Sequence, residues 1–154
     1  MYSLNAIASN FPLMMAAGAW LVAQLIKLVL TLLFCREDFS LKVLLSSGGM
    51  PSSHTSTVCA LTTSIAVMQG FASPLFAASA VLSFIVMYDA TGVRRSAGEQ
   101  AQTLNQIIQH LFDQQQLPID TTVREIFGHT PFQVFVGALI GIALPLTARF
   151  AFGV

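Results

Sequence analysis

Charged residues are scarce in this chain. Lys and Arg number seven and Asp and Glu seven, so they make up 9% of the 154 residues, against roughly 25% in ordinary soluble domains. The formal net charge is zero, which excludes the global positive field that typically attracts a nucleic acid. The two cysteines follow no spacing typical of a metal site or a disulfide framework, so we predict neither a metal nor a cofactor. Internal repeats and low-complexity linkers are also missing, which favours a single domain over residues 1–154.

Hydrophobic residues are abundant instead. They make up 55% of the chain, and the mean hydropathy is +0.72, values typical of integral membrane proteins. Apolar segments predict an all-α integral membrane bundle of about four spans: residues 11–34, 51–69, 75–93 and 132–152. No basic segment precedes the first span, so we interpret it as a retained membrane helix and not as a signal peptide. The second span is short and rich in Ser and Thr, which suits close packing between helices.

A polar but periodic segment follows the third span. Apolar residues recur at helical spacing in residues 96–116, which predicts an amphipathic helix lying beside the bundle at its cytoplasmic face. These residues are Ala97, Ala101, Leu104, Ile108 and Leu111. Residues 120–127 are predicted to form one more short helix. In the last span, Gly137 and Gly141 form a G-x-x-x-G pattern that indicates close helix packing, and small residues of this kind permit a homo-oligomer.

The stretch Gly-Gly-Met-Pro-Ser-Ser-His at residues 48–54 has the chemistry of an anion-binding helix start. Pro suits the first helical turn, where its missing N–H costs nothing, and Ser suits the cap. The free backbone N–H groups of such a turn, with the positive end of the helix dipole behind them, favour a phosphate. His54 stands beside them. For this stretch alone, an ordinary helix cap with a surface histidine is the alternative.

The number of predicted spans places most of the polar residues on one side of the membrane. The connections at residues 35–53 and 93–131 follow the first and third spans, so they face the same compartment. Most Lys and Arg outside the spans lie in these connections, and because positive residues stay on the cytoplasmic side, we predict a cytoplasmic polar face. Lys27 is costly inside the first span, which favours a functional or paired lysine. The polar face would hold His54, Asp89, Arg94, Arg95, Glu99, Arg124 and His129.

Two histidines and several cations on one membrane face indicate phosphoryl transfer. One imidazole can attack phosphorus and form a covalent phosphohistidine, and the other can protonate the leaving oxygen. Arginines can hold the phosphate oxygens and stabilise the charge that grows in the transition state. A scheme of this kind needs no metal.

Three motifs carry a resemblance to a known family. They are Gly-Gly-Met-Pro-Ser-Ser-His at 48–54, Tyr-Asp-Ala-Thr-Gly-Val-Arg-Arg at 88–95, and Gly-His-Thr-Pro-Phe-Gln-Val-Phe-Val-Gly-Ala at 128–138. The chain resembles the divergent branch of the type 2 phosphatidic acid phosphatase family, which is related to vanadium haloperoxidases. The resemblance implies a phosphatase that is embedded in membrane lipids. Its substrate would be a lipid phosphate, either an isoprenoid phosphate or a phosphatidate.

The resemblance also implies roles for individual residues. His129 matches the family's nucleophile and His54 its general acid. Gln133 stands four residues after His129, where the family has an Asp that orients the nucleophile. We expect Asp89 and Glu99 to orient other groups or to be structural. The expected phosphate-binding residues, with the backbone N–H groups of residues 52–54 as a cradle, are Lys27, Gly49, Ser52, Ser53, Arg94, Arg95 and Arg124.

Two other functions stay open. The chain could be a non-enzymatic membrane scaffold that binds a phospholipid, because Gln133 is not acidic and the family's cation motifs are not present as written. It could instead be a metal-dependent phosphotransferase that uses Asp89 and Glu99, although Asp89 would also suit an ion pair with Arg94 or Arg95 at a helix end. We expect the protein in a bacterial plasma membrane, with a plastid membrane as the alternative location.

Overall fold

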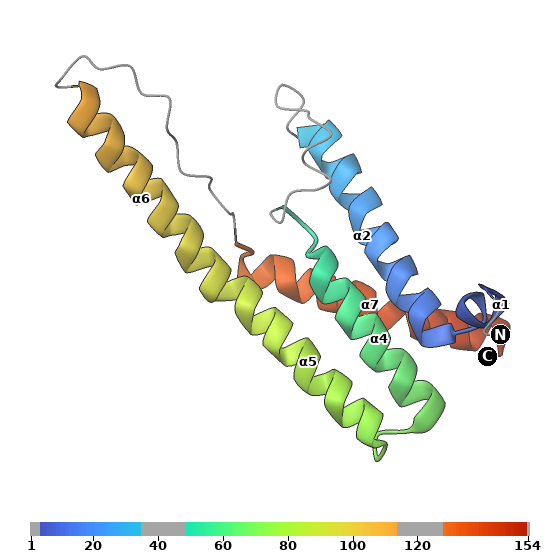
Figure 1. Cartoon of the computed structure of the whole chain (residues 1–154). Coiled ribbons are helices and arrows are strands. Elements are labelled where there is room, and N and C mark those ends of the chain that lie inside the picture. The colour runs from blue at the N-terminus through green and yellow to red at the C-terminus, as the bar shows by residue number, and fades with distance from the viewer. Residues whose placement is uncertain (1–3, 35–48, 114–127, 154) are drawn as a thin grey trace.

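The computed structural model describes residues 4–34, 49–113 and 128–153, and helices account for nearly all of them (Figure 1). The helices are α1 (Leu4–Ala8), α2 (Phe11–Phe34), α4 (Ser53–Gln69), α5 (Pro74–Thr91), α6 (Val93–Asp113) and α7 (Pro131–Phe152). No strand occurs among the described residues, and the predicted spans match α2, α4, α5 and α7 to within two residues at each end. The all-α prediction is therefore confirmed. The short α1 was not predicted, and the helix predicted at residues 120–127 lies outside the described residues.

α4 is the central helix of the bundle. It packs against α2, α5 and α7, whereas α2 and α5 flank it without packing on each other in the described part of the chain. The chain runs through the bundle in alternating directions in α2, α4 and α5, and α7 crosses obliquely, so that both termini lie at the same end (Figure 1). The opposite end of the bundle holds the start of α4, the end of α5 and the start of α7.

The outer helices have the length and composition of membrane spans. Three stretches qualify among the described residues: Phe11–Phe34, Pro74–His110 and Pro131–Ala151. Large apolar side chains are exposed along all three, for example Leu25, Phe84 and Phe135. Because a soluble protein rarely exposes such continuous apolar surface, these faces point to lipid, and the protein is an integral membrane protein.

α4 differs from the outer helices. It has 17 residues and is therefore about 26 Å long, short for a span. Its hydroxyl groups face the other helices: Ser56 and Ser64 are fully buried, and Ser83 of α5 donates a hydrogen bond to Val58 O at 3.0 Å. The predicted second span is thus a short, polar helix whose side chains pack mainly on protein.

Two glycines let α7 approach α4 closely. A Cβ at Gly137 would lie 2.6 Å from Ser52 O, and one at Gly141 would lie 2.5 Å from Ser56 O. The Ser56 hydroxyl also donates to Gly137 O at 3.0 Å, so the two backbones are joined by a side chain of α4. The G-x-x-x-G pattern therefore serves packing within the chain, as its spacing indicates.

The amphipathic helix forms, but its position differs from the prediction. α6 continues beyond the bundle along the direction of α5 rather than lying beside it (Figure 1). The physical reason lies at Gly92, where helical hydrogen bonding carries on: the Gly92 N–H donates to Tyr88 O, and the Ser96 N–H donates to Gly92 O, both at 2.9 Å. Only the single turn residue Gly92 separates the two helices, so α6 keeps nearly the direction of α5.

Candidate functional site

A buried lysine meets the turn that precedes α4. Lys27 lies in α2 and is only 2% exposed, and its aliphatic chain runs beside Gly49, where a Cβ would lie 3.6 Å from Lys27 Cδ and Cε. Gly49 has a φ of +88°, a left-handed conformation that glycine adopts without strain. The turn thus passes close over Lys27, which brings a cation from α2 to the start of α4.

Hydrogen bonds fix the first turn of α4. Ser52 is the N-cap, and its Oγ accepts from the Thr55 N–H at 3.4 Å and from Thr55 Oγ1 at 2.9 Å. The Ser52 N–H donates to Gln133 O of α7 at 3.2 Å. An α-helix leaves the N–H groups of its first turn without acceptors in the helix, so Ser53 and His54 are the positions whose N–H groups remain to bind an anion.

The structure narrows the expected role of Ser52 in the phosphate cradle, because its N–H donates to Gln133 O. Ser52 is fully buried, and both its N–H and its hydroxyl already bond protein atoms. The cradle is reduced to the backbone of Ser53 and His54. The side chain of Ser53 is also buried, at 4% exposure, whereas the His54 side chain is exposed.

His129 is held at the start of α7 by three elements. Its N–H donates to Ala90 O at the end of α5, at 3.0 Å, and its ring Nδ1 lies 3.2 Å from Gln133 Oε1. The preceding Gly128 lies so close to α6 that a Cβ there would collide with the backbone of Arg95. The imidazole is 3% exposed, so its position is set by packing as well as by hydrogen bonds.

A capping box decides the tautomer of His129. Thr130 is the N-cap of α7; the Gln133 N–H donates to Thr130 Oγ1 at 3.4 Å, and the Thr130 N–H donates to Gln133 Oε1 at 3.1 Å. A backbone N–H can only donate, so Gln133 Oε1 is an acceptor. His129 Nδ1 must then carry the proton that it shares with the same oxygen, which leaves the Nε2 lone pair free for chemistry.

Electrostatics favour a neutral His129. Burial lowers the pKa of its imidazole below the ordinary value, and the positive charges of Lys27 and Arg94 and the neighbouring His54 lower it further. The hydrogen bond with Gln133 opposes these effects and raises the pKa. The charges of Arg94, Lys27 and Asp89 also act on the His54 ring. The structure thus brings Lys27, His54, Asp89, Arg94 and His129 together, although they come from four separate segments of the chain.

The two arginines of the second motif have different surroundings. Arg94 Nε donates to Asp89 Oδ2 at 2.6 Å, in a half-buried ion pair beside the histidines. Arg95 Nε donates to Glu99 Oε1 at 3.0 Å in an exposed ion pair on α6. Arg94 is therefore the arginine of the site, whereas the side chain of Arg95 is engaged outside it. Arg124, also predicted to bind phosphate, lies outside the described residues.

The carboxylates do not share a metal-binding arrangement. Asp89 and Glu99 hold different arginines, as the ion-pair alternative for Asp89 anticipates. In residues 4–34, 49–113 and 128–153, no three His, Cys, Asp or Glu side chains gather where they could hold a metal ion. The geometry favours structural roles for both carboxylates.

One contributor was missed from the sequence. Thr130 caps α7 and supplies the N–H that orients Gln133, and thereby His129. The signal was present, because Thr-Pro-Phe-Gln at residues 130–133 has the spacing of a capping box directly before an apolar run.

Comparisons with known proteins give a family profile and a relative that each cover most of the chain. A family profile described as "Divergent PAP2 family" matches residues 8–144, a range that contains every residue of the site. The chain is 40% identical over 157 residues to a protein of Bacillus subtilis (strain 168) described as "Uncharacterized membrane protein YuiD"; the match covers 95% of this chain and 98% of that protein. No solved structure matches the chain.

Proposed function

The chain belongs to the Divergent PAP2 family, and from this premise we propose that it is a membrane phosphatase that hydrolyses the phosphate monoester of a lipid through a phosphohistidine on His129. The observation that carries the proposal is the hydrogen-bonded pair of Gln133 and His129. Because Gln133 Oε1 accepts from the Thr130 N–H, it also accepts the proton that His129 Nδ1 donates. The Nε2 lone pair is then available as the proposed nucleophile. Burial keeps the ring neutral near pH 7, as a nucleophile requires, by lowering its pKa.

The residues of the site then divide the reaction between them. In the first step, His129 Nε2 attacks phosphorus, the P–O bond to the lipid alcohol breaks, and His54 gives a proton to the leaving oxygen. In the second step, water attacks the phosphohistidine, the P–N bond breaks, and His54 takes a proton from that water. Inorganic phosphate leaves, and both imidazoles regain their starting protonation states. Lys27, Arg94 and the N–H groups of Ser53 and His54 stabilise the phosphoryl oxygens in both steps.

Gln133 replaces a charged partner by a neutral one. An amide oxygen orients the imidazole as a carboxylate does, but it adds no negative charge to stabilise the imidazolium. Burial and nearby cations therefore lower the pKa of His129, and the hydrogen bond to the neutral Gln133 opposes them without adding a charge. The His129 imidazole would therefore be a weaker base than one paired with a carboxylate, but it would stay neutral at lower pH.

Phosphate release in detergent tests the proposal. The purified protein is supplied with several lipid phosphates in the presence of EDTA, next to His129→Ala. We expect release that resists EDTA and that falls at least about a thousandfold in the variant, together with an acid-labile phosphohistidine in the native chain only. Release that EDTA abolishes would instead favour a metal-dependent phosphotransferase. Lipid binding without release by the native chain would favour a phospholipid-binding scaffold.

We also propose that the site faces the cytoplasm of a bacterial plasma membrane. The support is the excess of Lys and Arg in the connections at this end of the bundle. In a chain without native cysteines, Arg95→Cys should react with an impermeant thiol reagent only from the cytoplasmic side, and Arg149→Cys only from the opposite side. The reverse pattern would place the site outside.

A further inference from the structure

One face of α4 lies between α2 and α5, which pack on α4 but not on each other in the described residues. The exposed His54 lies on this face, and residues at a helical repeat of seven share it, because seven residues complete nearly two turns. The stripe runs from the site toward the other end of the bundle through His54, Leu61 and Met68. His54 therefore projects from the same face of α4 as two large apolar side chains.

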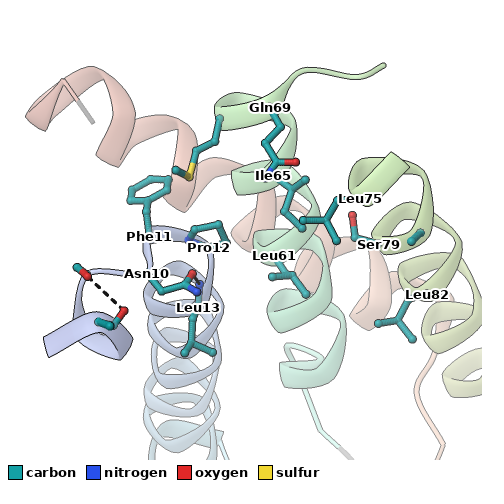
Figure 2. A pocket seen from close by; sticks show the side chains of 14 residues that line it. Asn10, Phe11, Pro12, Leu13, Leu61, Ile65, Gln69, Leu75, Ser79 and Leu82 are labelled. Carbon is teal, nitrogen blue, oxygen red and sulfur yellow. Dashed lines mark hydrogen bonds between the residues drawn. The ribbon is translucent and has the colours of Figure 1, made fainter. Parts of the chain in front are cut away.

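A large cavity occupies the far end of this face. It has a volume of about 720 Å³ and lies where α2 begins, α4 ends and α5 begins, at the opposite end of the bundle from the histidines. Figure 2 shows Leu13 of α2, Leu61 and Ile65 of α4, and Leu75 and Leu82 of α5 around it. This cavity is thus not at the candidate site, but the α4 residues Leu61 and Met68 that line it belong to the stripe that ends at His54.

The flanking helices repeat the pattern. On α2, Leu13 of the cavity is followed seven and fourteen residues later by Trp20 and Lys27. On α5, Leu75 and Leu82 of the cavity are followed at the same spacing by Asp89, the partner of Arg94. Each of the three helices therefore carries one stripe that starts at the cavity and ends at a polar residue of the site.

A second groove lies on a different side of α5. It has a volume of about 360 Å³ and lies between α5 and α7, lined by Phe84, Tyr88, Phe135 and Ala138 among others. Phe84 and Tyr88 do not share the seven-residue stripe of Leu75, Leu82 and Asp89. This groove offers similar apolar chemistry and reaches Thr91 and Pro131 near the candidate site, which makes it the competing place for a hydrocarbon chain.

We propose that the cleft between α2 and α5 binds the hydrocarbon chain of the lipid phosphate, with the phosphate at His54 and the chain end in the 720 Å³ cavity. The inference rests on the proposed function of the site. From His54 to Gln69, α4 rises about 22 Å, whereas half of a bilayer core is only about 15 Å. A chain that fills the cleft crosses the midplane, so the cleft fits a monophosphate of one long chain, such as a polyprenol, better than a diacyl phosphatidate.

A chain-length series tests this proposal. The ratio of KM for butyl phosphate to KM for hexadecyl phosphate is measured for the native chain, for Ala78→Trp, which fills the cleft cavity, and for Ala138→Trp, which fills the other groove. We expect Ala78→Trp to lower the ratio by about tenfold or more, the effect of two methylene groups that no longer leave water. Ala138→Trp should keep the native ratio. Leu82→Trp serves as a second cleft variant if Ala78→Trp does not fold.

The outcomes separate the cleft from the chemistry. An unchanged ratio in folded cleft variants, or a loss of the ratio in Ala138→Trp alone, would overturn the proposal while the phosphatase activity stands. If the native chain hydrolyses no phosphate, the proposed function fails, and equilibrium binding of alkyl phosphonates of the same lengths then reads the cleft directly. Length-dependent binding that Ala78→Trp removes would support the cleft, and binding that ignores chain length would overturn it.

Discussion

The two sides of α4 are built in opposite ways. On the side that packs on α7, glycines bring two backbones together, and Ser56 bridges them by a hydrogen bond to Gly137 O. On the side between α2 and α5, His54 and the apolar residues that follow it face an open cleft and a large cavity. Close packing with hydrogen bonds holds atoms in fixed positions, whereas an apolar cleft accepts chains of varying shape. The molecule thus has a rigid side that positions His129 and an adaptable side that suits a lipid.

Replacing Lys27 should have the largest effect, because its side chain is buried beside the turn that precedes α4 and its charge acts on His129. Lys27→Met keeps the length of the side chain but removes the buried charge beside the histidines. We expect kcat/KM for phosphate release to fall about 10²–10³-fold, as when one preorganised donor to a transition-state oxyanion is removed. Thr31→Val is the control, since the Thr31 hydroxyl donates to Lys27 O within α2. Equal losses in both variants would mean that α2 packing, not the charge, matters.

The rigid side is tested by glycine substitution. Gly141→Ala places a Cβ 2.5 Å from Ser56 O, so α4 and α7 must separate, and we expect the free energy of unfolding to fall by about 1–3 kcal/mol. Gly18→Ala is the matched change, because its Cβ would meet Leu144 Cδ2 at an ordinary 3.4 Å and should cost nothing. Thermal unfolding in detergent, followed by circular dichroism, measures both. Equal stability of the two variants would show that the α4–α7 contact tolerates expansion.

Gln133 tests how the side of α4 that packs on α7 sets the pKa of His129, the proposed nucleophile. Burial lowers the pKa of His129 although the hydrogen bond with Gln133 raises it, and the reaction needs the neutral ring, so activity should persist below the ordinary histidine pKa. Gln133→Leu removes the bond, which lowers the pKa and moves the acid limb of the pH–rate profile to lower pH, with kcat reduced about tenfold. Gln133→Glu keeps the capping box and adds a negative charge, so the acid limb should move to higher pH. Shifts in the same direction would contradict the assigned hydrogen bond.

We expect the smallest effects on stability and KM from substitutions that break the ion pairs. Asp89→Asn leaves Arg94 without its carboxylate, but the pair is partly exposed, so the free energy of unfolding should change by less than about 1 kcal/mol. The KM for a lipid phosphate should rise modestly, because Arg94 is no longer held beside the histidines. Glu99→Gln breaks the equivalent pair on α6 and should leave KM unchanged. A larger KM effect at Glu99 would move the site toward Arg95.

Local chemistry explains what could be predicted from the sequence. The spans were predictable because apolar runs of this length end at strong signals, such as Ser52 before α4, Pro74 at the start of α5 and Pro131 at the start of α7. The meeting of His54 and His129 at one end followed from counting spans. The axis of α6 could not be predicted in this way, because it depends on whether hydrogen bonding continues through a single glycine, Gly92.

The site was less predictable than the fold. The motifs placed His54, Arg94 and His129 together, but they did not separate Arg94 from Arg95, since both are adjacent cations with an acidic residue in reach. The role of Ser52 was also hidden, because its N–H bonds a carbonyl of Gln133, far away in the sequence. Contacts between distant segments decide such details. The cleft could not be predicted from the sequence for the same reason, because it depends on how three separate helices are oriented relative to one another.

α5 and α6 run on in nearly one direction through Gly92, so Pro74–His110 forms one rod of 37 residues, about 55 Å long. A bilayer core is only about 30 Å thick, so the rod stands out of the membrane like a lever arm. Asp89 and Arg94 lie near the point where the arm emerges, one on each side of the joint at Gly92. Because the ion pair spans Gly92, it ties the first turn of α6 to the end of α5, so a change in the tilt of α6 would reach the arginine of the candidate site.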